Sequence, residues 1–153
     1  MRSIMRALRY LHSNGMCHAD VKLENCLFSS LNLDTLHLID FGLSVNTKRP
    51  REIPAAMRGT LNYMAPELLS CTCSKPLVKN LCTSIDVWAA GVILFTLACG
   101  FLPFEGSSKE EIVQLMKEPE QSIHGRLTQA PQFQSLNPVL KDLILHMLRV
   151  DPR

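Results

Sequence analysis

The stretch His18-Ala19-Asp20-Val21-Lys22-Leu23-Glu24-Asn25, followed by Asp40-Phe41-Gly42, decides the interpretation of this chain. It places a carboxylate, a lysine and an amide on one loop and a second carboxylate on a neighbouring loop. Such a set can orient a hydroxyl group and hold Mg²⁺ on a nucleotide triphosphate, which are the tasks that phosphoryl transfer asks of a protein. Magnesium favours one or two carboxylates together with phosphate oxygens, and Asn25 with Asp40 offers ligands of that kind.

The composition indicates one globular domain. The chain has 153 residues, of which 46% are hydrophobic and 20% charged, values typical of a folded protein. The net charge of +2 is too small to predict nucleic acid or a membrane as a partner. One basic stretch is interpreted as a solvated loop rather than a phosphate site; its members are Lys48, Arg49, Arg51 and Arg58.

The cysteine pattern predicts free thiols. None of the 6 cysteines forms a CxxC pair, so no zinc site is expected. Arginines at positions 2, 6 and 9 interrupt the first dozen residues, so we expect no secretory leader. Reduced thiols in an intracellular, cytoplasmic protein are therefore predicted. The longest apolar stretch, 87–97, is too short to span a membrane.

Hydrophobic periodicity predicts a mostly helical α+β domain with four or five helices, one small hairpin and one long loop. The hairpin is expected from the apolar runs 26–28 and 36–39, and the long loop spans 43–62. The first helix is expected at 1–14, where Gly15 ends it, and a short helical turn is expected around Pro66. A third helix is expected at 85–99, with Ser84 as its N-cap and Gly100 at its end, and a fourth after the capping box at Ser108. The last helix is expected after Asn137-Pro138, and its apolar face consists of Leu140, Leu143, Ile144, Met147 and Leu148.

The order of five motifs resembles the eukaryotic protein kinase catalytic domain of the serine/threonine type. The motifs are His18-x-Asp20-x-Lys22-x-x-Asn25, Asp40-Phe41-Gly42, Gly59-Thr60, Ala65-Pro66-Glu67 and Asp86-x-Trp88-x-x-Gly91. The resemblance covers essentially the whole chain but only the larger, C-terminal lobe of that fold. It implies a partial kinase domain over 1–153, with a catalytic loop at 18–25, an activation segment at 40–67 and helices to the end of the chain.

This resemblance also implies roles for single residues. Asp20 corresponds to the catalytic base that accepts the proton of the substrate hydroxyl, and Lys22 to the lysine that contacts the γ-phosphate. Asn25 and Asp40 correspond to the metal ligands, and Leu27 to the residue under the adenine ring. ATP and Mg²⁺ are the implied cofactors, bound by Lys22, Asn25, Leu27 and Asp40, and a protein is the implied substrate.

Other positions are expected to support this site. Thr60 matches the threonine that hydrogen-bonds the catalytic aspartate and lysine in serine/threonine kinases. Asp86 matches a buried carboxylate that accepts bonds from the backbone near His18 and Ala19, since a buried aspartate is costly unless it is paired in this way. His18 and Phe41 resemble members of a packed column of side chains.

The sequence departs from the family pattern in three places. Ala19 replaces the arginine that would pair with a phosphorylated activation loop. No glycine-rich GxGxxG loop, lysine strand or helix glutamate occurs, so we expect weak nucleotide binding and a truncated enzyme. Glu67 lacks the expected arginine beyond Arg153, so the activation segment is expected to be loosely held unless Arg153 substitutes.

Two functions therefore stay open at this stage. The first is an ATP- and Mg²⁺-dependent serine/threonine kinase. The second is a catalytically impaired kinase-like module that binds a protein partner through the groove between residues 107–117 and 101–104. In either case the exposed lobe face would carry an apolar patch around Leu27, Ile39 and Phe41, which favours association with a partner. The Asp-Phe-Gly-Leu-Ser run is similar to calcium/calmodulin- or AMP-regulated kinase groups.

Overall fold

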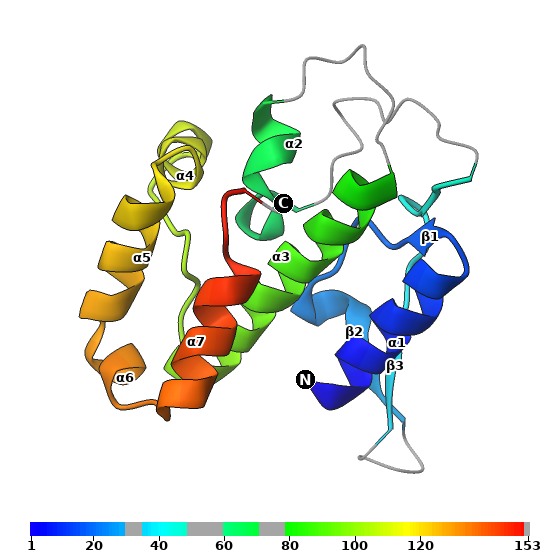
Figure 1. Cartoon of the computed structure of the whole chain (residues 1–153), viewed down its shortest axis with the longest axis horizontal. Coiled ribbons are helices and arrows are strands. Elements are labelled where there is room, and N and C mark those ends of the chain that lie inside the picture. The colour runs from blue at the N-terminus through cyan, green and yellow to red at the C-terminus, as the bar shows by residue number, and fades with distance from the viewer. Residues whose placement is uncertain (30–34, 49–59, 71–78, 152–153) are drawn as a thin grey trace.

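One long helix organises the molecule. The computed structural model describes residues 1–29, 35–48, 60–70 and 79–151. Helix α3 crosses its middle, with α1 and the strands on one side and α4–α7 on the other (Figure 1). The helices are α1 (Arg2–Ser13), α2 (Pro66–Ser70), α3 (Lys79–Cys99), α4 (Lys109–Met116), α5 (Glu120–Gln129), α6 (Pro131–Gln134) and α7 (Pro138–Met147), with short 3₁₀ turns η1 (Leu23–Asn25) and η3 (Leu61–Tyr63).

Helix α3 is buried on almost all sides, as its apolar composition predicts. Trp88, Val92 and Phe95 are each at most 2% exposed, and the helix ends at Gly100, whose φ of 87° is cheap only for glycine. The predicted start was wrong. The helix begins at Lys79, and Ser84 lies inside it, where its hydroxyl donates to Glu67 Oε1 at 3.0 Å.

The helix ends follow the predicted capping chemistry at both polar caps. Ser108 Oγ accepts from the Glu111 N–H at 3.2 Å, and the Glu111 carboxylate accepts from the Ser107 N–H at 2.7 Å. Asn137 accepts from the Val139 N–H at 2.8 Å before the proline that opens α7. These bonds satisfy amide donors that have no partner within the helix.

Two helices were missed and one helix face was only partly right. The pattern predicted nothing over 120–134, where α5 and α6 form.

In α7, Ile144 and Met147 are buried as expected, but Leu143 is 47% exposed. The helix therefore presents a narrower apolar stripe to α3 than the sequence alone predicts.

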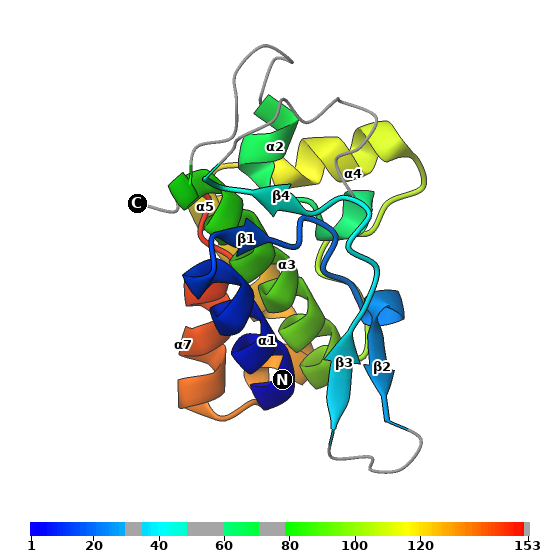
Figure 2. The same ribbon diagram turned by 90° about the vertical axis from the view of Figure 1, so that its right-hand side faces the viewer.

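The strands form two small antiparallel pairs. β2 (Cys26–Phe28) pairs with β3 (Leu36–Leu38), which confirms the predicted hairpin. β1 (Met16–Cys17) pairs with β4 (Val45–Asn46), so the predicted loop 43–62 is interrupted by a strand near its start. β1 contacts α1 and α3, and Figure 2 shows the β2–β3 hairpin extending away from the β1–β4 pair toward the lower end of the molecule. Residues 49–59 of that predicted loop lie outside the described residues.

Two further observations concern the cysteines and the length of the helices. Cys26 and Cys99 are free thiols, and burial raises the pKa of both. Within the described ranges, no helix combines the length and the apolar character needed to cross a bilayer.

Replacing Gly91 by alanine is expected to lower the free energy of unfolding by about 1–3 kcal/mol, because the added methyl overpacks the contact between α3 and α7. A Cβ at Gly91 would lie 2.8 Å from Met147 Cβ and 3.1 Å from Leu148 Cδ2. Urea unfolding followed by circular dichroism, which reports on all the helices, measures the change.

The matched control is Gly125→Ala in α5, where an added Cβ meets nothing within 4 Å. Alanine is a better helix former than glycine by about 1 kcal/mol, so this control is expected to stabilise the chain. If both substitutions changed the free energy of unfolding in the same direction, the packing argument would be contradicted.

Candidate active site

A cluster of donors surrounds the buried carboxylate of Asp20, which is 8% exposed. Lys22 Nζ donates to Asp20 Oδ2 at 2.8 Å, and Asn25 Nδ2 donates to the same oxygen at 3.2 Å. On the other oxygen, Oδ1, the N–H and the hydroxyl of Thr60 donate at 3.2 and 3.3 Å. Two stretches that are far apart in sequence therefore meet at one carboxylate, and the expected bond from Thr60 is confirmed.

The charges of the site favour a protonated Lys22. Its hydrogen bond to Asp20 raises the pKa of the ammonium group, although desolvation opposes this, and the charges of Asp20, Glu24 and Asp40 raise it further. Lys22 Nζ also donates to Thr60 Oγ1 at 3.0 Å. A fixed positive charge beside a buried carboxylate suits the stabilisation of negative charge on a transferred group.

Asp86 holds the backbone of the loop, as expected. It is 1% exposed, and its two oxygens accept the His18 N–H at 2.9 Å and the Ala19 N–H at 2.8 Å. Ala19 has a φ of 64°, a left-handed conformation that costs a residue with a Cβ about 1–2 kcal/mol. The two bonds to Asp86 thus stabilise a strained turn directly before Asp20.

Asp40 lies just after β3 and is tied to the same loop. The Ile39 N–H donates to the Asn25 carbonyl at 2.9 Å, and His18 Nε2 lies 3.0 Å from the Ile39 carbonyl oxygen, to which it donates. Asp40 itself has a φ of 64°, and its Oδ1 accepts the Gly42 N–H at 3.1 Å. The expected contact between the rings of His18 and Phe41 is present, with centroids 5.0 Å apart.

The hairpin beside the site presents apolar side chains to solvent. Leu27 is 50% exposed, Ile39 37% and Phe41 47%. Exposed groups of this size next to a polar cluster are typical of a surface that another structural element or ligand covers. This agrees with the apolar patch expected from the sequence.

The donor chemistry at Asn25 and Asp40 suits Mg²⁺. Asn25 Nδ2 donates to the backbone carbonyl of Asp20 at 2.8 Å and also to the Asp20 carboxylate. Because the amide nitrogen faces Asp20, the amide oxygen, which is the atom that binds cations, faces away from Asp20. Among the described residues, no group of three His, Cys, Asp or Glu side chains could hold a metal ion unaided. One carboxylate and one amide oxygen fit a magnesium ion that also binds phosphate oxygens.

Glu67 has a partner that the sequence did not predict. Its carboxylate accepts the Ser84 hydroxyl at 3.0 Å, which links α2 to α3. Burial raises the pKa of the Glu67 carboxyl, although hydrogen bonds from its own N–H and from Ser84 oppose the rise. Arg153, which was considered as a substitute partner, lies outside the described residues.

The raised pKa of Glu67 leads to a prediction about pH. A carboxyl whose folded pKa exceeds its unfolded pKa adds stability below the unfolded value and loses it as pH rises through the folded pKa. Glu67→Gln keeps an acceptor for Ser84 but cannot ionise. We therefore expect Glu67→Gln to become more stable relative to the native chain as the pH rises from about 4 to about 7. The measured quantity is the free energy of unfolding of the variant minus that of the native chain.

Urea titrations across this range measure the difference, with the exposed Glu105→Gln as the control. A difference that stays flat with pH for Glu67→Gln would mean that burial does not perturb this carboxyl.

Comparisons with known proteins give similarity over the full length of the chain. The family described as "Protein kinase domain" matches residues 1–153. Calcium/calmodulin-dependent protein kinase cmkA of Emericella nidulans is 31% identical, calcium-dependent protein kinase 22 of Oryza sativa subsp. japonica 38%, and the phosphorylase b kinase gamma catalytic chain, liver/testis isoform, of Homo sapiens 34%. Each match covers 99% of this chain but only 34%, 24% and 35% of the relative, respectively. The chain therefore spans about a third or less of their length.

Proposed function

The chain belongs to the protein kinase family, and from this premise we propose that its residues form the larger, helical lobe of a serine/threonine kinase domain. The proposed reaction is the transfer of the γ-phosphoryl group of ATP to a protein hydroxyl. The observation that carries the proposal is the convergence of Lys22, Asn25 and Thr60 on the Asp20 carboxylate. A carboxylate held in this way has a fixed orientation.

Asp20 is proposed to orient the substrate hydroxyl and to accept its proton during attack. Lys22 lies 2.8 Å from Asp20 and is proposed to offset the negative charge of the transferred group. Thr60 fixes both side chains through its N–H and hydroxyl. Positioning and charge stabilisation supply most of the catalysis in phosphoryl transfer, because there is little covalent work for the protein to do.

The nucleotide side of the site is proposed to lie over the hairpin. Mg²⁺-ATP, when bound, would supply the transferable phosphoryl group. Asn25 and Asp40 would hold the metal, and Leu27, which is half exposed on β2, would contact the adenine ring. The exposure of Leu27, Ile39 and Phe41 supports this assignment, since a covered nucleotide site needs an apolar floor.

The proposal is tested by two measurements on the full chain. Binding of ATP is measured with and without Mg²⁺, and phosphate transfer is measured on a generic basic protein substrate, followed by phosphoamino-acid analysis. We expect Mg²⁺-dependent binding that Asp40→Ala weakens and transfer to serine or threonine. Transfer mainly to tyrosine would contradict the assigned class. Binding without any transfer would favour the kinase-like binding module instead.

A further inference from the structure

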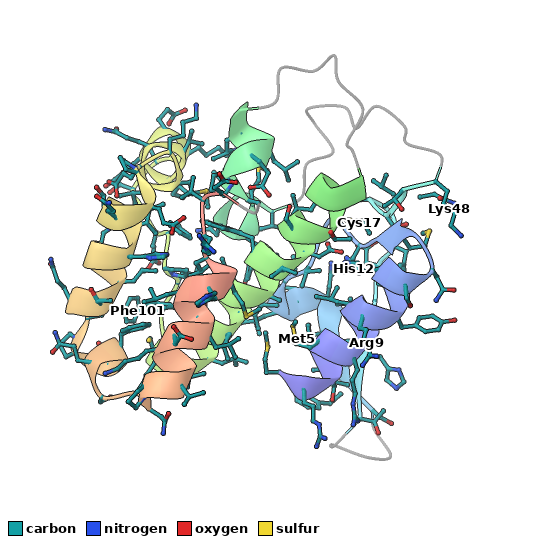
Figure 3. All side chains as sticks on the ribbon, viewed as in Figure 1. Met5, Arg9, His12, Cys17, Lys48 and Phe101 are labelled. Carbon is teal, nitrogen blue, oxygen red and sulfur yellow. The ribbon has the colours of Figure 1, made fainter. Side chains whose placement is uncertain are left out.

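Three arginines line the exposed side of α1. Arg2, Arg6 and Arg9 are all exposed, and their i, i+4, i+7 spacing places them on one helical face. We refer to these three side chains as the basic stripe. Lys48 adds a fourth positive charge just beyond the helix, where a Cβ added at Gly15 would lie 3.0 Å from Lys48 Cε. Figure 3 shows Arg9 on α1 and Lys48 near the end of that helix, on the side of the molecule away from α4–α7.

The described elements around α1 do not neutralise the basic stripe. α1 contains no acidic residue, and neither do β1 and β3, the two strands that pack against it. α3 also packs against α1, but its one acidic residue, Asp86, is 1% exposed. Within the part of the chain that the structure describes, none of the three arginines takes part in an ion pair. The positive charge of the stripe therefore faces solvent.

The basic stripe also works against the stability of its own helix. Arg2 lies in the first turn of α1, where the helix dipole favours acidic side chains and none is present. Arg2 and Arg6 are four positions apart, a spacing at which like charges repel each other. Departures from such local rules are expected where a surface serves a function rather than the fold. The charge pattern therefore indicates a contact surface.

We propose that the exposed face of α1 binds an acidic segment of a partner protein. The arginines are separated along the helix by about 6 Å and about 4.5 Å, and alternate residues of an extended chain are separated by about 6.8 Å. An extended segment with acidic side chains at alternate positions can therefore pair with the stripe, and arginine binds carboxylates through two parallel hydrogen bonds. Tyr10 and Met5, which are 70% and 38% exposed, lie on the same helix. They supply apolar contacts of the type that is enriched at protein interfaces.

The test uses the full chain and two fluorescein-labelled peptides, one of alternating glutamate and glycine and one of alternating lysine and glycine. Binding is followed by fluorescence anisotropy at about 50 mM and about 500 mM NaCl, because salt screens exposed charges. Arg6→Glu reverses one charge of the stripe. Lys109→Glu is the matched control, since it makes the same change of net charge at an exposed position that opens α4. The basic stripe lies outside the cluster around Asp20, so its binding is measurable in a chain that transfers no phosphate.

We expect the glutamate peptide to bind more tightly than the lysine peptide and to bind more weakly at the higher salt concentration. Arg6→Glu should weaken this binding by about tenfold, because an attraction becomes a repulsion of similar size, whereas Lys109→Glu should leave it unchanged. Equal weakening by the two variants would overturn the proposal, since only the net charge would then matter. Binding to phosphatidylserine vesicles but not to the glutamate peptide would also overturn it, because the partner would then be a membrane.

A second variant separates binding from folding. Arg2→Glu places an acidic side chain in the first turn of α1 and four positions before Arg6, so it should raise the Tm by about 2 °C. The same substitution should weaken the binding of the glutamate peptide, and a loss of binding with a gain in stability cannot result from unfolding. Unchanged binding by Arg2→Glu would overturn the proposal. A fall in the Tm would contradict the inference that the stripe opposes the stability of its helix.

Discussion

Replacing Asp20 by asparagine is expected to lower the rate of phosphoryl transfer by a factor of about 10²–10⁴, the contribution typical of a positioned general base. The amide cannot accept a proton from the substrate hydroxyl. The amide is also uncharged, so Lys22, whose Nζ lies 2.8 Å from Asp20 Oδ2, loses its ion pair and retains the hydrogen bond to Thr60 Oγ1. The rate is measured under saturating Mg²⁺-ATP with a protein substrate.

Asp142→Asn is the matched control, since it makes the same chemical change on a side chain that is 76% exposed in α7. Its rate should equal that of the native chain. Circular dichroism checks that Asp20→Asn retains the helical fold. Transfer by Asp20→Asn at the native rate would exclude Asp20 as the base or identify the activity as a contaminant.

The contacts around Asp20 could be predicted from the sequence only in part, and the reason is physical. Asp20, Lys22 and Asn25 lie within one short segment, so a single irregular loop can bring their side chains together, and the structure shows that it does. The resemblance added Thr60 and Asp86, which local reasoning cannot place. The bond between His12 and Asp86 was missed because the two residues are 74 positions apart, and a histidine at the end of an amphipathic helix carries no local sign of such a bond.

The errors in the fold have different causes. Ser84 has the residue type of a helix cap, but its hydroxyl bonds to Glu67 in another helix, so a tertiary contact overrides the local preference. The strands of the β1–β4 pair have two residues each, too few to show a period. For α5 a signal was present, since Ile123 and Leu127 are four positions apart and both buried.

Replacing Asp86 by alanine is expected to lower the free energy of unfolding by roughly 3–5 kcal/mol, the cost of removing one side of a buried charged contact. The substitution leaves the N–H groups of His18 and Ala19 and the His12 ring without an acceptor in a site that water cannot enter freely. Ala19 would then hold its left-handed conformation unaided. Urea unfolding followed by circular dichroism measures the loss, because Trp88 lies too close to Asp86 to serve as a neutral reporter.

Asp86→Asn and Asp142→Ala complete the comparison. Asparagine keeps one acceptor oxygen but turns an NH₂ group toward a donor. Asp86→Asn should therefore lower the free energy of unfolding, but by less than Asp86→Ala does. The exposed Asp142→Ala should change stability by no more than about 0.5 kcal/mol. If Asp86→Ala cost as little as Asp142→Ala, the buried carboxylate would not be what holds the catalytic loop, and the support proposed for Asp20 through Ala19 would have to come from elsewhere.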